Sequence, residues 1–185
     1  MGPRGLVRLS KPSAGDLNDL SELAQVSRGL HRPWVYLSPT QEGWRNHLLR
    51  THRHDFVSYL LRRRDTDELV GVVNLSEIVR GVFQSAYLSF YAHARHAGQG
   101  LMKEGVGAVI RRAFRVHRLH RVEANIQPGN RPSLQLVRTL GFRREGLSPK
   151  YLKIGGRWRD HERWALTREA WSRSSRNERR RTTRG

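Results

Sequence analysis

The chain has 185 residues, the length of one ordinary domain that can bury a core. It carries 35 Lys and Arg residues against 16 Asp and Glu residues, a formal net charge of +19, so we expect it to attract polyanions. The absence of cysteine excludes disulfides, thiolate zinc sites and a cysteine nucleophile. No apolar run is long enough to cross a bilayer or to act as a secretory signal, so we expect a cytoplasmic protein with no membrane partner.

The N-terminal part of the chain predicts a short strand, over residues 5–10, followed by two helices. Ser13 and Asp16 have the spacing of a capping box, in which two side chains satisfy free N–H groups at the start of a helix. Ser38 and Pro39 predict the second helix, with Ser38 as its N-cap and the proline at its first position.

The middle of the chain changes from strand to helical periodicity. Segments rich in β-branched and aromatic residues predict an antiparallel meander of three strands at residues 55–62, 68–76 and 83–92. Apolar side chains then recur at helical spacing over residues 100–117, which predicts the longest helix.

The C-terminal part predicts three strands around one short helix. The strands are expected at residues 121–127, 143–154 and 157–167. Asn130 is the predicted N-cap of the helix, and Gly141 ends it. Gly155 and Gly156 join the last two strands, because both can adopt the positive φ of a type I′ turn.

The chain ends in a basic segment, residues 172–185, which holds six arginines and one glutamate. We expect this segment to be a disordered, solvated tail, because no large apolar residue anchors it. No repeat or linker interrupts the elements before it, so residues 1–171 are expected to form a single domain of the α+β class.

The segment Arg95 to Gly100 reads R-x-x-G-x-G and stands between a predicted strand and the longest helix. Backbone amides that converge before a helix N-terminus form an anion site suited to a pyrophosphate, to which Arg95 and His96 would add charge. Two glycines before a helix also occur as a plain turn, so the string alone leaves both interpretations open.

Several further motifs follow in a fixed order. They are N-x-x-S at 130–133, R-x-L-G-F-R-R-E-G at 138–146, YLKIGGRWRDH at 151–161, VRGVFQ at 79–84 and HRPW at 31–34. Together with the glycine loop they resemble the GNAT acetyltransferase family, and within it the RimJ/RimL group of ribosomal-protein-alanine N-acetyltransferases. The resemblance covers nearly the whole chain except the basic tail.

The resemblance implies the GNAT fold, a mixed and mostly antiparallel sheet of about seven strands that splays between the fourth and fifth and is flanked by helices. It also implies that acetyl-CoA lies in the splay, where the pantetheine arm pairs with main-chain groups of one strand. The implied cofactor-binding residues are Leu88, Ser89, Phe90, Arg95, His96, Ala97, Gly98, Gln99, Gly100, Leu101, Met102 and Asn130.

The resemblance also implies direct transfer of an acetyl group to an amine, for which two residues are catalytic candidates. Ser133 would protonate the leaving thiolate, although it could instead cap or pack the first helical turn. Asn125 stands where some relatives have a catalytic glutamate, and asparagine cannot act as a base. Glu123 is a further carboxylate on the same strand face, where a structural role is favoured.

Three residues are candidates for binding the acceptor substrate: Trp34, Glu77 and Tyr151. Each also has a structural interpretation, as a core aromatic, a loop carboxylate and a hairpin residue. His93 with His96, and His117 with His120, have spacings that a metal could use. We expect no metal site, because neither cysteine nor an H-E-x-x-H motif accompanies them.

The first functional hypothesis is therefore an acetyl-CoA-dependent N-acetyltransferase whose partner is a protein N-terminus, possibly that of a ribosomal protein beginning with Ala or Ser. Ribosome or rRNA association through the basic surface and tail would fit the charge, and we expect a monomer or a homodimer. Two alternatives stay open. One is an N-acetyltransferase for small amines such as antibiotics or polyamines, and the other is a catalytically weak ribosome- or RNA-binding protein on the same scaffold.

Overall fold

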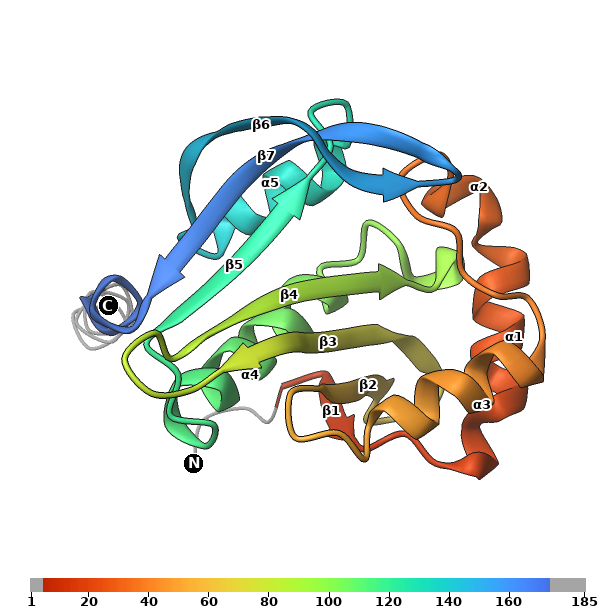
Figure 1. Ribbon diagram of the computed structural model, residues 1–185. Coiled ribbons are helices and arrows are strands. Elements are labelled where there is room, and N and C mark those ends of the chain that lie inside the picture. The colour runs from red at the N-terminus through yellow and green to blue at the C-terminus, as the bar shows by residue number, and fades with distance from the viewer. Residues whose placement is uncertain (1–4, 174–185) are drawn as a thin grey trace.

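The computed structural model describes residues 5–173, and a seven-stranded sheet forms its centre (Figure 1). The strands lie in the order β1-β2-β3-β4-β5-β7-β6. Their bounds are β1 Val7–Ser10, β2 Val57–Arg63, β3 Leu69–Val79, β4 Ser85–Ala92, β5 Arg121–Ile126, β6 Arg143–Ile154 and β7 Arg157–Thr167. Strands β4 and β5 pair in parallel and all other neighbours pair antiparallel, so the predicted mixed, mostly antiparallel sheet is confirmed.

The sheet splays between β4 and β5. The two strands pair only where Ser85 to Tyr87 run beside Arg121 to Glu123. Beyond Tyr87 the strands diverge, as Figure 1 shows, while β4 continues to pair with β3 on its other side. The expected splay between the fourth and fifth strands is therefore confirmed, and it leaves one edge of β4 without a strand partner.

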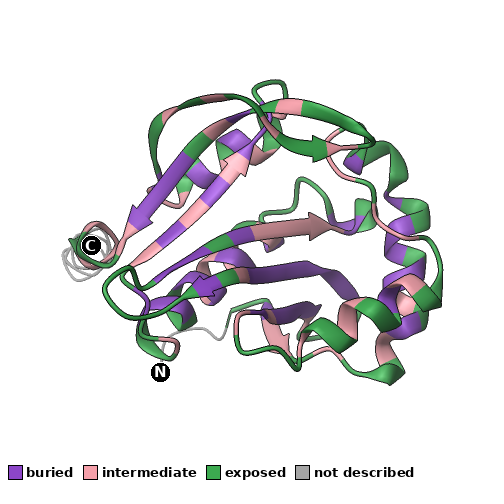
Figure 2. Ribbon diagram, viewed as in Figure 1, coloured by how far each residue is buried: buried purple, intermediate pink, exposed green. Residues whose placement is uncertain are grey.

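The sheet is flanked by helices α1 Leu17–Val26, α2 Arg28–His31, α3 Gln41–Arg50, α4 Leu101–Arg115 and α5 Arg131–Thr139. The larger core cluster includes Val106 and Ile110 of α4 together with Leu88 of β4. A second cluster joins Leu20 of α1 and Trp44 of α3 to Val72 of β3. Strand β3 is purple over most of its length in Figure 2, because this central strand is covered on both faces of the sheet.

The helix starts agree with the sequence at one place and differ at another. The Asp16 carboxylate accepts hydrogen bonds from the N–H and Oγ of Ser13, both at 2.7 Å, so the predicted capping box is present before α1. Ser38 is not the N-cap of α3. Thr40 is, with its Oγ1 accepting from the N–H of Gly43 at 3.3 Å. Ser38 instead bonds Thr40 and forms part of the turn that presents this cap.

The last hairpin follows the predicted bounds of both strands, and Gly155 and Gly156 have φ values of +57° and +80°. Residues 168–173 then form a helical segment, in which the Trp171 ring lies 5.4 Å from the Phe114 ring. The expected tail therefore begins inside a helix, and its remainder, residues 174–185, lies outside the described residues. None of the helices in residues 5–173 is long and apolar enough to span a membrane.

Candidate active site

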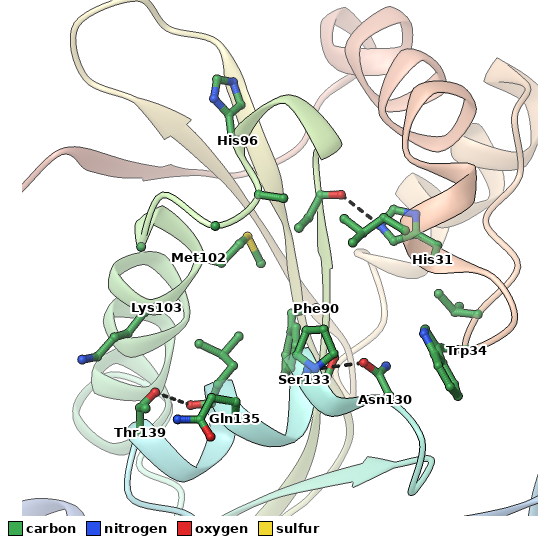
Figure 3. A pocket seen from close by; sticks show the side chains of 18 residues that line it. His31, Trp34, Phe90, His96, Met102, Lys103, Asn130, Ser133, Gln135 and Thr139 are labelled. Carbon is green, nitrogen blue, oxygen red and sulfur yellow. Dashed lines mark hydrogen bonds between the residues drawn. The ribbon is translucent and has the colours of Figure 1, made fainter.

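A cavity of about 380 Å³ opens beside the free edge of β4. Its walls come from α2, the end of β4, the loop before α4, and both α4 and α5 (Figure 3). The lining residues are Leu30, His31, Trp34, Val35, Phe90, Ala92, His96, Ala97, Gly98, Gly100, Met102, Lys103, Asn130, Pro132, Ser133, Gln135, Leu136 and Thr139.

The glycine loop forms one wall of this cavity. A short 3₁₀ helix, η2 Ala94–His96, precedes the loop, and Gly98 and Gly100 have φ values of +76° and +77°. Other residues adopt this conformation only with strain, which explains both glycines. A Cβ atom at either position would meet no atom within 4 Å, so the space above the backbone is open. The loop leads into the N-terminus of α4, whose first N–H groups have no intrahelical partner.

These features fit the phosphate-rich part of acetyl-CoA, because unpaired helical N–H groups and an open backbone surface suit a pyrophosphate. The free edge of β4 offers main-chain donors and acceptors for the extended pantetheine arm. Lys103, in the first turn of α4, adds a cation to the cavity wall. The residues present therefore match the cofactor that the resemblance implies.

The predicted cofactor residues divide into two groups. Those that line the cavity are Phe90, His96, Ala97, Gly98, Gly100, Met102 and Asn130. Leu88, Ser89, Arg95, Gln99 and Leu101 do not line it. Leu88 and Leu101 have core side chains, so these two could contribute main-chain groups only, while the exposed Arg95 side chain pairs with Glu22 at 3.1 Å. His96 is buried, and in Figure 3 its ring points away from the centre of the cavity.

The start of α5 brings Asn130 and Ser133 to the cavity, as predicted. The Asn130 Oδ1 accepts a hydrogen bond from the N–H of Ser133 at 3.3 Å, so Asn130 caps the helix. The Ser133 hydroxyl makes no hydrogen bond to any other group in residues 5–173, although Ser133 lines the cavity. Ser133 therefore contributes only its backbone N–H to the cap of α5, and its hydroxyl is available to a ligand.

Asn125 and its neighbours on the sheet lie on the face opposite the cavity, whereas the acceptor candidate Trp34 lines the cavity itself. The even-numbered residues from Ala86 to Phe90 face the core and the cavity, and so do Val122 and Ala124 of β5. Tyr87, Ser89, Glu123 and Asn125 alternate with them and point to the other side. The cavity is thus separated from Asn125 by the sheet, with the splay as the connection between the two faces.

Two tyrosines meet at the narrow end of the splay. The hydroxyls of Tyr87 and Tyr151 lie 3.3 Å apart. The hydrogen bond to Tyr151, partial burial and the nearby carboxylates Glu123 and Glu77 raise the pKa of Tyr87 to about 12, so it stays protonated. Glu77 lies at an irregularity of β3 with a φ of +49°.

Glu123 is paired rather than free. Its Oε1 lies 2.6 Å from the Arg121 guanidinium, which also pairs with Glu145. This network of ion pairs ties β5 to β6 and supports the structural role for Glu123 that the sequence favoured.

Neither capping nor periodicity in the sequence indicated that His31, Lys103, Gln135 or Thr139 would lie at the site. His31 belongs to the four-residue helix α2, which is too short for periodicity to predict. Its Nε2 lies 2.9 Å from the carbonyl oxygen of Ala92, and burial lowers its pKa, so the ring is neutral at pH 7 and donates this bond. Trp34, which was predicted, lies on the same side of the cavity (Figure 3).

Within residues 5–173 no three His, Asp or Glu side chains converge as a metal site. The histidines of the two spaced pairs have other partners. His117 Nε2 lies 2.7 Å from the Tyr59 hydroxyl, and His120 pairs with Glu169 at 3.1 Å. The His93 and His96 rings lie 5.7 Å apart, and the Nε2 of His96 is 3.8 Å from the Glu68 carboxylate.

Comparison with known proteins agrees with this architecture. Residues 7–143 match the acetyltransferase (GNAT) domain family. A ribosomal protein uS5-alanine N-acetyltransferase of Escherichia coli is 43% identical over 108 residues, which are 58% of this chain and 56% of that protein. A probable N-acetyltransferase of Bacillus subtilis, YjcK, is 39% identical over 100 residues, 54% of this chain and 55% of that protein. The chain thus aligns with about half the length of these curated relatives.

Solved structures extend the similarity over most of the chain. A ribosomal-protein-S5-alanine acetyltransferase from Vibrio fischeri superposes with a TM-score of 0.80 at 25% identity, covering 91% of this chain and 97% of that one. RimJ of Mycobacterium smegmatis, in complex with CoA-disulfide, has the same fold, with a TM-score of 0.82 at 24% identity over 89% of this chain and 83% of that one. The glycine loop, the splayed sheet and the match over residues 7–143 lead to one conclusion: this chain belongs to the GNAT acetyltransferase family.

Proposed function

We propose that the protein is an acetyl-CoA-dependent N-acetyltransferase that acts on the N-terminal α-amine of a protein, with a ribosomal protein beginning with Ala or Ser as its acceptor. The 43% identity to a ribosomal protein uS5-alanine N-acetyltransferase carries this proposal. The cavity between β4 and α5 supports it, because it offers a cofactor groove beside the splay.

Acetyl-CoA supplies an acetyl group activated as a thioester. The amides from Gly98 to Met102 would hold its pyrophosphate, the free edge of β4 from Leu88 to Phe90 would hold its pantetheine arm, and Asn130 would lie near its thiol end. Ser133 lies three residues from Asn130 on the first turn of α5, so its free hydroxyl is the proton donor at this end of the cavity.

The acceptor needs little help to lose its proton. A peptide α-amine has an unperturbed pKa of about 7.7 to 8.0, so a useful fraction is neutral at cytoplasmic pH. Asn125 cannot take a proton and has the role of positioning the amine on the face opposite the cavity. Ordered water can then accept the proton, and Glu123 is left to its ion pair with Arg121.

A second observation favours association with rRNA. Lys11 and Arg112 lie over the Tyr59 ring, and Arg80 donates to the carbonyl oxygen of His117, whose ring bonds the Tyr59 hydroxyl. None of these three cations pairs with a carboxylate in residues 5–173. The Lys11 ammonium lies 4.3 Å from the centre of the Tyr59 ring, and burial together with Arg112 lowers the Lys11 pKa. Cations held together without a counter-charge attract phosphates, so this cluster is the proposed rRNA contact.

Release of free thiol from acetyl-CoA tests the enzymatic proposal. The assay compares peptides that begin with Ala, Ser or Met, the same peptides with blocked N-termini, and a panel of small amines. We expect release only with a free peptide N-terminus. Release of thiol with small amines alone would show that the protein acetylates a small-molecule amine and not a protein N-terminus.

Binding of a single-stranded RNA at increasing salt tests the rRNA proposal. The double variant Lys11→Glu, Arg112→Glu should weaken binding about tenfold or more and reduce the salt dependence by roughly two counterions. The control variant Lys153→Glu, Arg157→Glu makes the same change of charge on the last hairpin. Equal loss in both variants would show that only the net charge of the chain attracts RNA.

A further inference from the structure

A row of polar side chains crosses the sheet on the face opposite the cavity. The strand registers place Ser58 beside Asn74, and Asn74 beside Ser89. Tyr87 pairs with Glu123 in the parallel register, so the next residues on the same face, Ser89 and Asn125, lie level with each other across the splay. On this face of the sheet the polar row therefore runs from Ser58 through Asn74 to Ser89, and Asn125 continues it on the other side of the splay.

Ser89 has a hydroxyl whose hydrogen-bond capacity is only partly used. Its Oγ accepts from the Nδ2 of Asn74 at 3.2 Å and from the hydroxyl of Tyr91 at 3.4 Å. These two bonds occupy the lone pairs of the oxygen. The O–H of Ser89 remains, and it donates to no group in the described part of the chain, so it is available to a ligand in the splay.

Asn125 has an amide group that is not held. Its Oδ1 is buried without a partner, and its Nδ2 makes no hydrogen bond within residues 5–173. The side chain is only half-buried, on a strand face that borders the splay. Because no bond fixes the amide, it can turn its oxygen toward a hydrogen-bond donor in the gap.

The buried side chain of Asn74 lowers the stability of the fold. It is 2% exposed, and its Oδ1 is buried without a partner. A buried unpaired oxygen destabilises a fold, so an apolar residue would suit the position better unless the amide has another task. The interaction that the structure records for this side chain is the bond to Ser89, which fixes the orientation of the Ser89 hydroxyl.

We propose that Ser89 and Asn125 bind the main chain of the acceptor's first residue in the splay. The Asn125 Oδ1 accepts from the α-amine, and the Ser89 O–H donates to the carbonyl oxygen of the same residue. Asn74 is a positioning residue that acts through Ser89. This inference rests on the proposed function and adds to it the residues that recognise a peptide N-terminus.

The pairing of one acceptor with one donor favours a peptide over a polyamine. A peptide N-terminus presents an amine and a carbonyl oxygen on adjacent atoms of one residue, which matches both groups. A protonated polyamine has donors only and would leave the Ser89 O–H without a partner. Discrimination of this kind is strong, because an unpaired buried polar group penalises the wrong ligand.

Steady-state kinetics of four variants tests the inference, with an Ala-starting peptide and acetyl-CoA varied separately. Ser89→Ala and Asn125→Leu should each raise the KM for the peptide about tenfold and leave the KM for acetyl-CoA within about twofold, since one hydrogen bond is lost in each. Asn125→Asp keeps an oxygen acceptor and should restore most of the peptide affinity. Ser58→Ala is the control, because Ser58 lies in the same row but bonds His47 and not Ser89.

Asn74→Leu separates positioning from a structural role. It should raise the peptide KM several-fold while the thermal midpoint stays unchanged or rises, because it removes the unpaired oxygen. Added to Ser89→Ala, it should have no further effect on the peptide KM, because it acts through the missing hydroxyl. A lower midpoint with an unchanged KM would make Asn74 purely structural.

The outcomes separate this inference from the proposed function. If the wild-type protein acetylates the peptide while Ser89→Ala and Asn125→Leu leave its KM unchanged, the inference is wrong and the proposed function stands. If the wild-type protein neither binds nor acetylates a peptide with a free N-terminus, both are wrong.

Discussion

The Nε2 of His31 lies 2.9 Å from the carbonyl oxygen of Ala92, and this bond joins α2 to the last residue of β4. Both residues line the cavity. Strand β4 has no partner on its β5 side at this end, so the bond supplies a lateral contact that the sheet does not. The same contact sets the position of α2, which carries one wall of the proposed cofactor groove.

Replacement of His31 by leucine tests this contact. His31→Leu leaves the Ala92 carbonyl without its donor, so the free energy of unfolding should fall by about 1 to 2 kcal/mol. The affinity for acetyl-CoA should fall several-fold, because the wall formed by α2 is no longer tied to β4. Denaturant unfolding and calorimetric titration with acetyl-CoA measure the two effects. His54→Leu, at an exposed position, should change neither, and unchanged acetyl-CoA affinity in His31→Leu would refute the role of the contact.

The glycine loop allows a matched pair of substitutions. Gly98→Glu places bulk and negative charge where the pyrophosphate is expected, so acetyl-CoA binding should be lost. Gly81→Glu makes the same change at a residue with a similar φ of +66° and equally open space, but at the turn between β3 and β4. Both variants should lose comparable stability to backbone strain, about 1 to 2 kcal/mol. Retained affinity for acetyl-CoA in Gly98→Glu would place the pyrophosphate elsewhere.

Ser133→Ala tests the proposed proton donor. The hydroxyl takes no part in the cap of α5, so stability should change by less than about 0.5 kcal/mol. Turnover should fall by about ten- to a hundredfold while acetyl-CoA affinity is kept, since proton transfer contributes to the reaction and not to binding. Asn130→Ala removes the cap itself and should cost about 1 kcal/mol of stability. Rapid-quench kinetics measures the turnover of Ser133→Ala, and equilibrium binding measures its affinity for acetyl-CoA. Normal turnover in Ser133→Ala would exclude the donor role.

The stability of the protein should fall as the solution is acidified below neutral pH. Burial, with a contribution from Arg50, lowers the pKa of His47 from 6.5 to about 4. The unfolded chain therefore binds a proton more readily than the folded one, so this contribution is complete above pH 6.5 and is lost as pH falls toward 4. For a half-buried group the effect is roughly 1 to 2 kcal/mol.

Urea unfolding at pH 7 and pH 4.5 measures this effect. His47→Gln keeps a partner for the Ser58 hydroxyl but has no proton to gain, so its stability should fall less between the two pH values than that of the wild type. Other histidines with lowered pKa values, including His31 and His161, leave part of the slope in place. Equal slopes in both proteins would assign the pH dependence to those residues.

Most of the secondary structure followed from short-range patterns in the sequence. The capping box at Ser13, the cap at Asn130 and the turn at Gly155 depend on residues within a few positions of each other, and all three are present. The cap at Ser38 was wrong because Ser38 and Thr40, two positions apart in the same turn, have the same capping chemistry, and only the backbone geometry selects Thr40. Helix α2 was missed because four residues carry no periodic signal.

The sequence by itself determined most of the strands and longer helices, the apolar face of the longest helix and the turn at Gly155 and Gly156, because capping, periodicity and backbone sterics act over a few residues. The tertiary structure decided which side of the sheet each candidate residue occupies. It placed His31 beside Ala92, and it set Ser89 across the splay from Asn125. These relationships depend on strand register and on the divergence of β4 from β5, which the packing of distant segments fixes and local sequence cannot.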